Sequence, residues 1–223
     1  MLNTKPDEAL LMIETVCGNL VNPSNPHSDA IDINDIGWAL SRLPRFCGHT
    51  VTEVVYNVAQ HSIYVCELLE FFLNNIDAFD KVGGSLPATS NPRYFCDYSA
   101  MQKKSFLLKA LLHDAHEAYI GDIPSPVKRI PELRATVKLI EAKLDKAIFD
   151  RFSLEETTEN EKILIKFCDN MAQAIEGYQF MPSRGRGWEL PKPTLTMLQN
   201  FPSPLPPLES YARFISKFVE LEQ

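Results

Sequence analysis

Apolar residues recur at steps of three and four along most of this chain, and that spacing constrains its fold more than any other feature. In the segment 57–73 the apolar residues keep this spacing around His61, which places His61 on the inward face of a helix. The segment 100–119 repeats the pattern. Further helices are predicted at 6–20, 33–43, 133–152 and 155–178. Because strand-length alternation of apolar and polar residues is rare, the sequence predicts an all-α helical bundle.

Two segments interrupt the helical spacing. The segment 77–98 contains two adjacent glycines and two prolines, which is typical of a long loop. The segment 181–207 holds seven prolines and is expected to run over the surface before a last helix at 208–222. Loops of this length often serve as lids or oligomer contacts, and a plain insertion is an equal alternative.

Length and charge limit the classes of protein to consider. With 223 residues, 45% of them hydrophobic, the chain can bury a substantial core and is too short to need two full domains, so one domain over 1–223 is expected. A net charge of -7 argues against a stable complex with nucleic acid, which needs a dense cationic surface. A small anionic substrate is still allowed, because a few local cations or a metal ion outweigh the overall charge.

The cysteines and the hydropathy pattern indicate where the protein works. Five cysteines, an odd number without a CxxC pair, suggest free thiols in a reducing cytoplasm rather than a disulfide framework. No run of about eighteen apolar residues, the length needed to cross a bilayer, occurs. The N-terminus lacks the pattern of an export signal. A cytoplasmic protein without membrane contact is therefore predicted.

The most informative stretch is ALLHDAHEAYIGDIPSPVKR, residues 110–129. His113 and Asp114 offer an imidazole nitrogen and a carboxylate oxygen from adjacent positions, and together they can hold one divalent ion. Glu117 follows one helical turn beyond Asp114, and Asp122 lies at a Gly-Asp-Ile-Pro turn. Burying so many charged groups beside an apolar run would be costly without compensating cations. The alternatives without a catalytic role are that Glu117 faces solvent and that Asp122 only forms the turn.

A histidine on an earlier helix and an aspartate on a later one complete an H...HD...D pattern. It resembles the signature of the HD-domain metal-dependent phosphohydrolases, and it consists of His61, His113, Asp114 and Asp169. The words IDINDIGWALSRLPRFCGHT, YNVAQHS and LLHDAHEAYIGDIPSPVK look like the 5'-deoxynucleotidase branch and its phage-encoded dNTP and dATP phosphohydrolase relatives. The resemblance covers residues 31–178. It implies an HD-type helical bundle whose four named residues bind one divalent metal ion, with Mn, Co, Mg, Zn, Fe and Ni all open.

The resemblance also implies roles around the metal. Glu117 would position or deprotonate the attacking water, and Asp122 would act as an acid near the leaving oxygen. Arg45, in the RFCGHT word, matches the family arginine that contacts phosphate, and Lys128 is a second phosphate candidate. Relatives often have tryptophan after that arginine, where this chain has Phe46, so the contact to base or sugar is open.

The predicted function is hydrolysis of the 5' phosphoester of a deoxynucleotide. Both a dNMP 5'-nucleotidase and a dNTP triphosphohydrolase, including one selective for dATP, fit the pattern. The alternatives are an HD hydrolase of cyclic nucleotides or short oligonucleotides, and a catalytically silent nucleotide-binding module. Relatives suggest a homo-oligomer, either a dimer or a larger ring, and a phage-encoded protein would act in the host cytoplasm.

Overall fold

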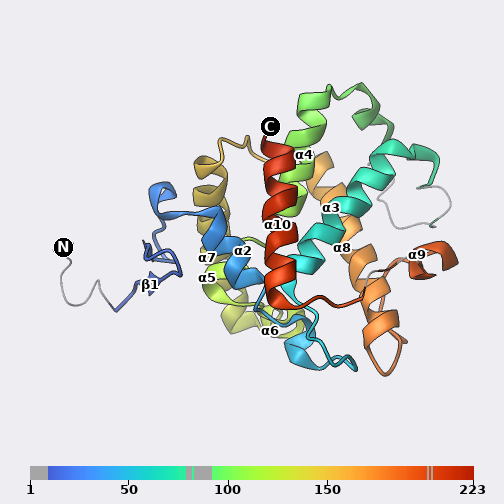
Figure 1. Cartoon of the computed structure of the whole chain (residues 1–223), viewed down its shortest axis with the longest axis horizontal. Coiled ribbons are helices and arrows are strands. Elements are labelled where there is room, and N and C mark those ends of the chain that lie inside the picture. Colours follow the sequence, from blue (N-terminus) through green and yellow to red (C-terminus); the bar gives the residue numbers. More distant parts are fainter. Residues whose placement is uncertain (1–9, 79–81, 83–91, 200, 202) are drawn as a thin grey trace.

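Helices make up most of the part of the chain that the structure describes (Figure 1). The computed structural model describes residues 10–78, 82, 92–199, 201 and 203–223. The α-helices are α2 (Ile33–Leu40), α3 (Val58–Asn74), α4 (Ala100–Leu111), α5 (Glu117–Ile120), α6 (Ser125–Lys128), α7 (Pro131–Arg151), α8 (Glu159–Phe180), α9 (Leu195–Gln199) and α10 (Pro207–Glu222). Shorter elements are the strands β1 (Ile13–Glu14) and β2 (Leu20–Val21) and the 3-10 helices η1 (Ser28–Ala30), η2 (Arg45–Gly48), η3 (Ile76–Ala78) and η4 (Pro92–Asp97). The prediction of an all-α bundle is confirmed.

Helix α3 is the centre of the bundle. It packs against α4, α8 and α10, which surround it in Figure 1. Its residues from Val58 to Cys66 are all buried. A helix that the core surrounds on every side has a mainly apolar sequence. The side chain of Asn57 accepts a hydrogen bond from the Gln60 amide and so caps the start of the helix. His61 is thereby fixed in the first turn of the most buried helix.

Helix α8 is anchored at its first turn. Thr158 and Glu161 form a capping box, in which each side chain accepts a hydrogen bond from the other residue's backbone amide. The Glu161 carboxylate also pairs with the buried Lys109 of α4, at 3.2 Å. This pair fixes α8 against α4, and therefore fixes the position of Asp169 further along α8.

The predicted helix 100–119 is broken in two. Helix α4 ends at Leu111, residues 112–116 form turns, and α5 begins at Glu117. The Nδ1 atom of His113 lies 2.8 Å from the carbonyl oxygen of Ala110, the acceptor that a continuing helix would offer to the amide of Asp114. His113 and Asp114 therefore stand on a turn rather than on a regular helix.

The predicted helix 6–20 is wrong over the residues that the structure describes. Residues 10–21 form turns and the antiparallel pair β1–β2, which lies at one edge of the molecule next to α2 (Figure 1). Gly18, with φ of 82°, takes the left-handed conformation that the turn needs. Residues 6–9 lie outside the described part. The other predicted helices are present with shifted ends, and α10 at Pro207–Glu222 matches the predicted last helix.

The two predicted loops contain little regular structure where they are described. In 77–98 the structure describes η4 and parts of the flanking segments, and the remaining residues lie outside the described part. Before α10 begins at Pro207, the described residues of the segment 181–207 contain one helix, the five-residue α9. Its end is tied to α3 by Gln60, which donates to the Ser203 carbonyl at 2.8 Å and accepts from the Leu205 amide at 3.0 Å. Among the helices described, none is long and apolar enough to span a membrane.

Candidate metal centre and active site

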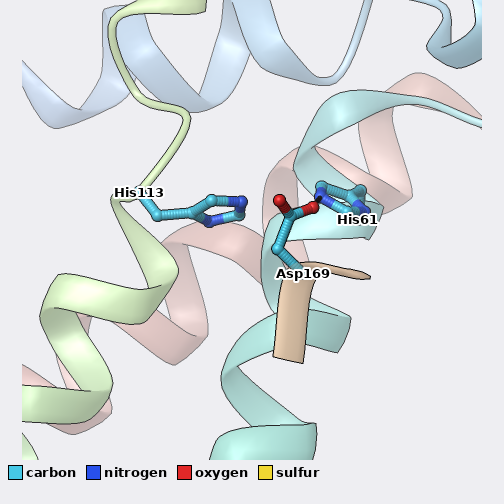
Figure 2. Close-up of side chains that lie close together, drawn as sticks. All are labelled: His61, His113 and Asp169. Carbon is cyan, nitrogen blue, oxygen red and sulfur yellow. Dashed lines mark ion pairs between the residues drawn. The ribbon is translucent and has the colours of Figure 1, made fainter. Parts of the chain in front are cut away.

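Four side chains predicted as metal ligands converge from three parts of the chain. Nε2 of His61, on α3, lies 3.3 Å from Oδ1 of Asp169, on α8, and 3.6 Å from Oδ2 of Asp114. Nε2 of His113 lies 3.1 Å from the same Asp114 oxygen. Figure 2 shows His61, His113 and Asp169 pointing toward one another, and each offers a ligand atom within 4.8 Å of the others.

The two imidazoles are oriented as metal ligands require. Nδ1 of His61 lies 2.6 Å from a Glu176 oxygen, and Nδ1 of His113 lies 2.8 Å from the Ala110 carbonyl oxygen. Both partners are acceptors, so each Nδ1 carries a proton, and Nε2 is the ring nitrogen that each histidine can offer to a metal ion. Both Nε2 atoms are buried and have no hydrogen-bond partner within the described part of the chain. Two such nitrogens beside two carboxylates fit a divalent transition-metal ion.

The electrostatics of the centre favour a cation. Burial and Arg45 would lower the pKa of His61, but Glu176 and Asp169 outweigh them and raise it to about 9. Burial would raise the pKa values of Asp114 and Asp169, but the neighbouring histidines lower both, so the two carboxylates are ionised at neutral pH. The protein groups alone thus create a site that attracts positive charge.

Glu176, which the sequence analysis gave no role, links the centre to Arg45. Its fully buried carboxylate accepts hydrogen bonds from His61, from the Tyr56 hydroxyl at 3.0 Å and from the Arg45 guanidinium at 3.3 Å. It follows Asp169 by seven residues, two helical turns, and so lies on the same face of α8. That spacing was the one signal in the sequence that could have suggested it.

Arg45 is presented by a strained turn. The next two residues, Phe46 and Cys47, have φ angles of 54° and 52°, in the left-handed region that non-glycine residues seldom adopt. Such conformations cost about 1–3 kcal/mol each and cluster at functional sites. The Arg45 amide bonds the Tyr56 carbonyl at 2.9 Å, which fastens the turn next to the start of α3. The turn brings the guanidinium to Glu176, at the edge of the centre.

Glu117 and Asp122, the two predicted catalytic carboxyl groups, lie in an environment that favours their protonated forms. Burial, Asp114 and Asp122 raise the pKa of Glu117 to about 8. Burial also raises the pKa of Asp122, assisted by Asp114 and opposed by Arg45. Oε2 of Glu117 is buried without a hydrogen-bond partner in the described chain, so it is available to a substrate or to water.

Lys128, the second predicted phosphate contact, is already engaged with carboxylates. Its ammonium group lies 2.8 Å from Glu141 of α7 and 3.7 Å from Glu117. His116, next to the predicted ligands, also turns to α7, where its Nδ1 lies 2.8 Å from Asp145. Burial would lower the pKa of His116, but Asp145 outweighs it and raises the value to about 9. Helix α7 therefore supports the turn that carries His113 and Asp114.

Phe46 lies beside an aromatic residue from the proline-rich segment. Its ring centroid is 5.8 Å from that of Trp188, with the planes tilted by 32°. Trp188 in turn lies directly on Gly177 of α8, where a Cβ atom would come within 2.5 Å of the indole ring. Only glycine allows this contact, so Trp188 packs on its own chain, next to Glu176.

Comparison with known proteins first indicates the class of protein that this chain resembles. A family model described as "5'-deoxynucleotidase YfbR-like" matches residues 85–181. That segment contains the HD turn, Glu117, Asp122, Lys128 and Asp169, whereas Arg45 and His61 precede it. Together with the helical fold and the convergent His and Asp groups, this match supports a metal-dependent HD-domain phosphohydrolase.

Two curated relatives extend the similarity. The uncharacterized protein YfdR of Escherichia coli (strain K12) is 27% identical over 213 residues, which cover 95% of this chain and 96% of that protein. The uncharacterized protein RCAP_rcc00048 of Rhodobacter capsulatus is 31% identical over 111 residues, which cover 50% of this chain and 43% of that protein. Neither name states an activity, so these relatives supply no substrate.

Proposed function

We propose that this chain is a metal-dependent hydrolase that cleaves the 5' phosphoester of deoxynucleotides. The observation that carries the proposal is the convergence of His61, His113, Asp114 and Asp169, with two buried imidazole nitrogens that lack hydrogen-bond partners in the described chain. The family description supports the nucleotide substrate. The deoxyribose preference rests on that description and on the resemblance of the sequence motifs.

The four ligands would hold one divalent ion, which supplies Lewis acidity toward a phosphoryl oxygen and lowers the pKa of water near it. Glu176 keeps the proton of His61 on Nδ1, and the Ala110 carbonyl does the same for His113. With a metal ion bound, both Nε2 atoms would be unprotonated and would face the centre. The chain thus fixes the ligands in the orientation that the reaction needs before any substrate arrives.

Glu117 and Arg45 would act on water and on phosphate. Glu117 is buried, and its free Oε2 can orient a water or take its proton. Asp122 would give a proton to the leaving O5' oxygen. Arg45 would offset the charge that builds on the phosphoryl oxygens as the phosphoester breaks. Lys128 would contribute positive charge from its place between Glu117 and Glu141.

A substrate panel with matched variants tests the proposal. The purified full chain is loaded with Mn²⁺ or Co²⁺ and incubated with dNMPs, dNTPs, ribonucleotides, cyclic nucleotides and dinucleotides, and the products are separated by chromatography. The Asp114→Ala variant is expected to lose bound metal and at least about a thousandfold in turnover, whereas Asp29→Ala, at an exposed position on η1, should keep both.

Two outcomes would contradict the proposal. Elemental analysis that finds no metal in the wild-type protein after loading would favour a silent binding module. Turnover of cyclic nucleotides or dinucleotides without any turnover of deoxynucleotides would show that the assigned substrate is wrong.

A further inference from the structure

Helix α7 carries an acid that contacts two residues beside the metal centre. Glu141 lies near the middle of this 21-residue helix, which packs against the four-residue α6. Its Oε1 atom lies 2.8 Å from the ammonium nitrogen of Lys128 and 3.6 Å from Nε2 of His116. The Glu141 side chain is only 17% exposed, so water screens these contacts less than it screens a surface ion pair. Glu141 has so far been given no role.

The ammonium group of Lys128 lies between two carboxylates at different distances. Glu141 is at hydrogen-bonding distance, 2.8 Å, whereas Oε1 of Glu117 is 3.7 Å away. Burial would lower the pKa of Lys128, but the hydrogen bond to Glu141 and the charge of Glu117 outweigh it and raise the pKa. The ammonium group is therefore charged at neutral pH, bonds directly to Glu141 and faces Glu117 across a longer gap.

The longer gap leaves the Glu117 carboxyl group open. Glu117 is 3% exposed, and its Oε2 atom has no hydrogen-bond partner in the described chain. A carboxylate that orients a water or takes its proton has to keep a lone pair available for that water. An ammonium group bonded directly to Glu117 would compete with the water, because a charge-assisted hydrogen bond is stronger than a neutral one.

The side chain of Lys128 needs a restraint because it is long and flexible. It extends from the last residue of the short helix α6, and its three N–H donors can turn to any acceptor within reach. Among the described residues, Glu141 and Glu117 are the two carboxylates within 4.0 Å of its nitrogen. If Glu141 were removed, Glu117 would be the acceptor nearest to the ammonium group.

The contact between Glu141 and His116 is the weaker of the two contacts that Glu141 makes. It spans 3.6 Å, whereas Nδ1 of His116 lies 2.8 Å from Asp145, one helical turn further along α7. Asp145 would thus still orient His116, and with it the turn that carries His113 and Asp114, if Glu141 were changed. Helix α7 therefore has one acid for the turn and another for Lys128.

We propose that Glu141 is a positioning residue, which holds Lys128 away from Glu117 and so keeps the Glu117 carboxyl group open to water. It acts through Lys128 rather than on the substrate. The inference rests on the proposed phosphohydrolase function, in which Glu117 acts on water. Without Glu141 the ammonium group would move onto Glu117, and the protein would still bind its metal ion and substrate but would turn over slowly.

The Glu141→Met variant tests the proposal in the full chain loaded with Mn²⁺. Methionine has a similar length and helix propensity but no carboxylate to hold the ammonium group. With dNMPs and dNTPs as substrates, we expect kcat to fall about tenfold, while KM and the affinity for Mn²⁺ stay within about twofold of the wild type. The matched control, Glu132→Met, makes the same change at an exposed position in the first turn of α7 and should leave kcat unchanged. A wild-type kcat in Glu141→Met would overturn the inference.

A double variant separates positioning from a structural role. Lys128→Met removes the group on which Glu141 is proposed to act, together with any contribution of that charge to catalysis. In this background Glu141→Met should change kcat by no more than about twofold, because no ammonium group is left to reach Glu117. An equal loss from Glu141→Met in both backgrounds, or a loss of Mn²⁺ affinity, would show that Glu141 supports the fold or the turn, and would overturn the inference.

The same double variant keeps the proposal testable if Glu141→Met alone does not fold. Removing one member of a buried ion pair leaves the other without its partner, whereas replacing both members by apolar side chains avoids that cost. The comparison of Lys128→Met/Glu141→Met with Lys128→Met then decides. Equal kcat values support the inference, and a further tenfold loss contradicts it.

A crystal structure of Glu141→Met gives a result that does not depend on turnover. Nζ of Lys128 should lie about 3 Å from a Glu117 oxygen, in place of 3.7 Å. An ammonium group that kept its distance or turned to solvent would overturn the inference and leave the proposed function standing. If the wild type hydrolysed no nucleotide, the proposed function would fail, and the position of Lys128 in this structure would still decide whether Glu141 holds it away from Glu117.

Discussion

The carboxylates of Glu176 and Asp35 each accept at least three hydrogen bonds, but they do so in different surroundings. Glu176 is fully buried. Of its donors, Arg45 is positively charged, and His61 is positively charged when it is protonated. Asp35 of α2 lies beside the N-terminal hairpin, and its donors are the neutral side chains of Thr15 and Asn19 and the amide of Cys17. The donors of Glu176 are 115 to 131 residues away in sequence, whereas those of Asp35 are 16 to 20 residues away.

The difference teaches what each carboxylate can control. Burial raises the pKa of both groups, and the hydrogen bonds or charges around each outweigh that effect and lower it. Loss of Glu176 would leave Arg45 and His61, a proposed metal ligand, buried without their partner, which would affect the whole bundle and the candidate active site. Loss of Asp35 would release a short hairpin at the edge of the molecule.

The largest effect is expected from Glu176→Gln. The variant keeps the shape of the side chain but removes the charge that faces Arg45 and His61. We expect a loss of about 3 kcal/mol in the free energy of unfolding, because a buried charge loses its partner. We also expect a 10–100-fold weaker affinity for Mn²⁺, because His61 is no longer held in one orientation. Chemical denaturation and calorimetric titration with the metal measure the two.

Tyr56→Phe serves as the matched control for that variant. It removes one neutral hydrogen bond to the same carboxylate and leaves both charged contacts in place. It should cost about 1 kcal/mol of stability and leave the metal affinity within about twofold of the wild type. Equal metal affinities in Glu176→Gln and the wild type would show that Glu176 is structural rather than a positioning residue.

The second prediction tests whether the packing of Trp188 on Gly177 stabilises the buried contacts of Glu176. Alanine in place of glycine normally stabilises a helix interior by about 1 kcal/mol. At Gly177, next to Glu176, the new methyl group would collide with Trp188. We expect Gly177→Ala to destabilise the protein by about 1–2 kcal/mol and to shift the tryptophan fluorescence as the indole leaves α8.

In a double variant, the effect of Gly177→Ala on stability should change sign. In a Trp188→Ala background the collision is absent, so Gly177→Ala should then stabilise the protein by about 1 kcal/mol, as in an ordinary helix. If Gly177→Ala were destabilising to the same extent in both backgrounds, the contact with Trp188 would not be the reason for the glycine.

Helices with a buried stripe could be predicted from the sequence, and the N-terminal hairpin could not. The apolar residues of α3 recur at helical steps because the core surrounds them. Leu10, Ile13 and Val16 also recur at steps of three, but they are 84%, 36% and 56% exposed. Their spacing therefore reflects no core contact, and a turn at Gly18 with hydrogen bonds to Asp35 determines the local structure instead.

The candidate site shows the same limit. The His113-Asp114 motif, with His61 before it and Asp169 after it, predicted a cluster of side chains, and the fold does bring these side chains together. Glu176 was missed because a glutamate within a helix is usually solvent-facing, and its burial depends on Arg45 and His61, distant in sequence. The engagement of Lys128 with Glu141 likewise depends on where α7 packs.

A smaller and local effect is expected from Asp35→Asn. The amide keeps one acceptor oxygen but turns a donor toward donors, so part of the contact with Thr15, Cys17 and Asn19 is lost. The hairpin should open more readily by about 1–2 kcal/mol, with the metal affinity unchanged. Hydrogen exchange at the Cys17 amide measures the opening, and a comparable loss of protection throughout α3 would contradict a local role.

The smallest effect is the pH dependence of that same contact. The folded-state pKa of Asp35 is lowered from its usual value of 3.8, so its stabilisation is fully present above that value and is lost as the pH falls through the folded-state pKa. The difference in Cys17 protection between the wild type and Asp35→Asn should therefore be constant from about pH 7 to pH 5 and should shrink below about pH 4. The amide of Ser41, bonded within α2 to Gly37, is the internal control and should show no such difference. A difference that persisted undiminished to pH 2 would mean that the carboxylate charge does not hold the hairpin, and that the shape of the side chain does.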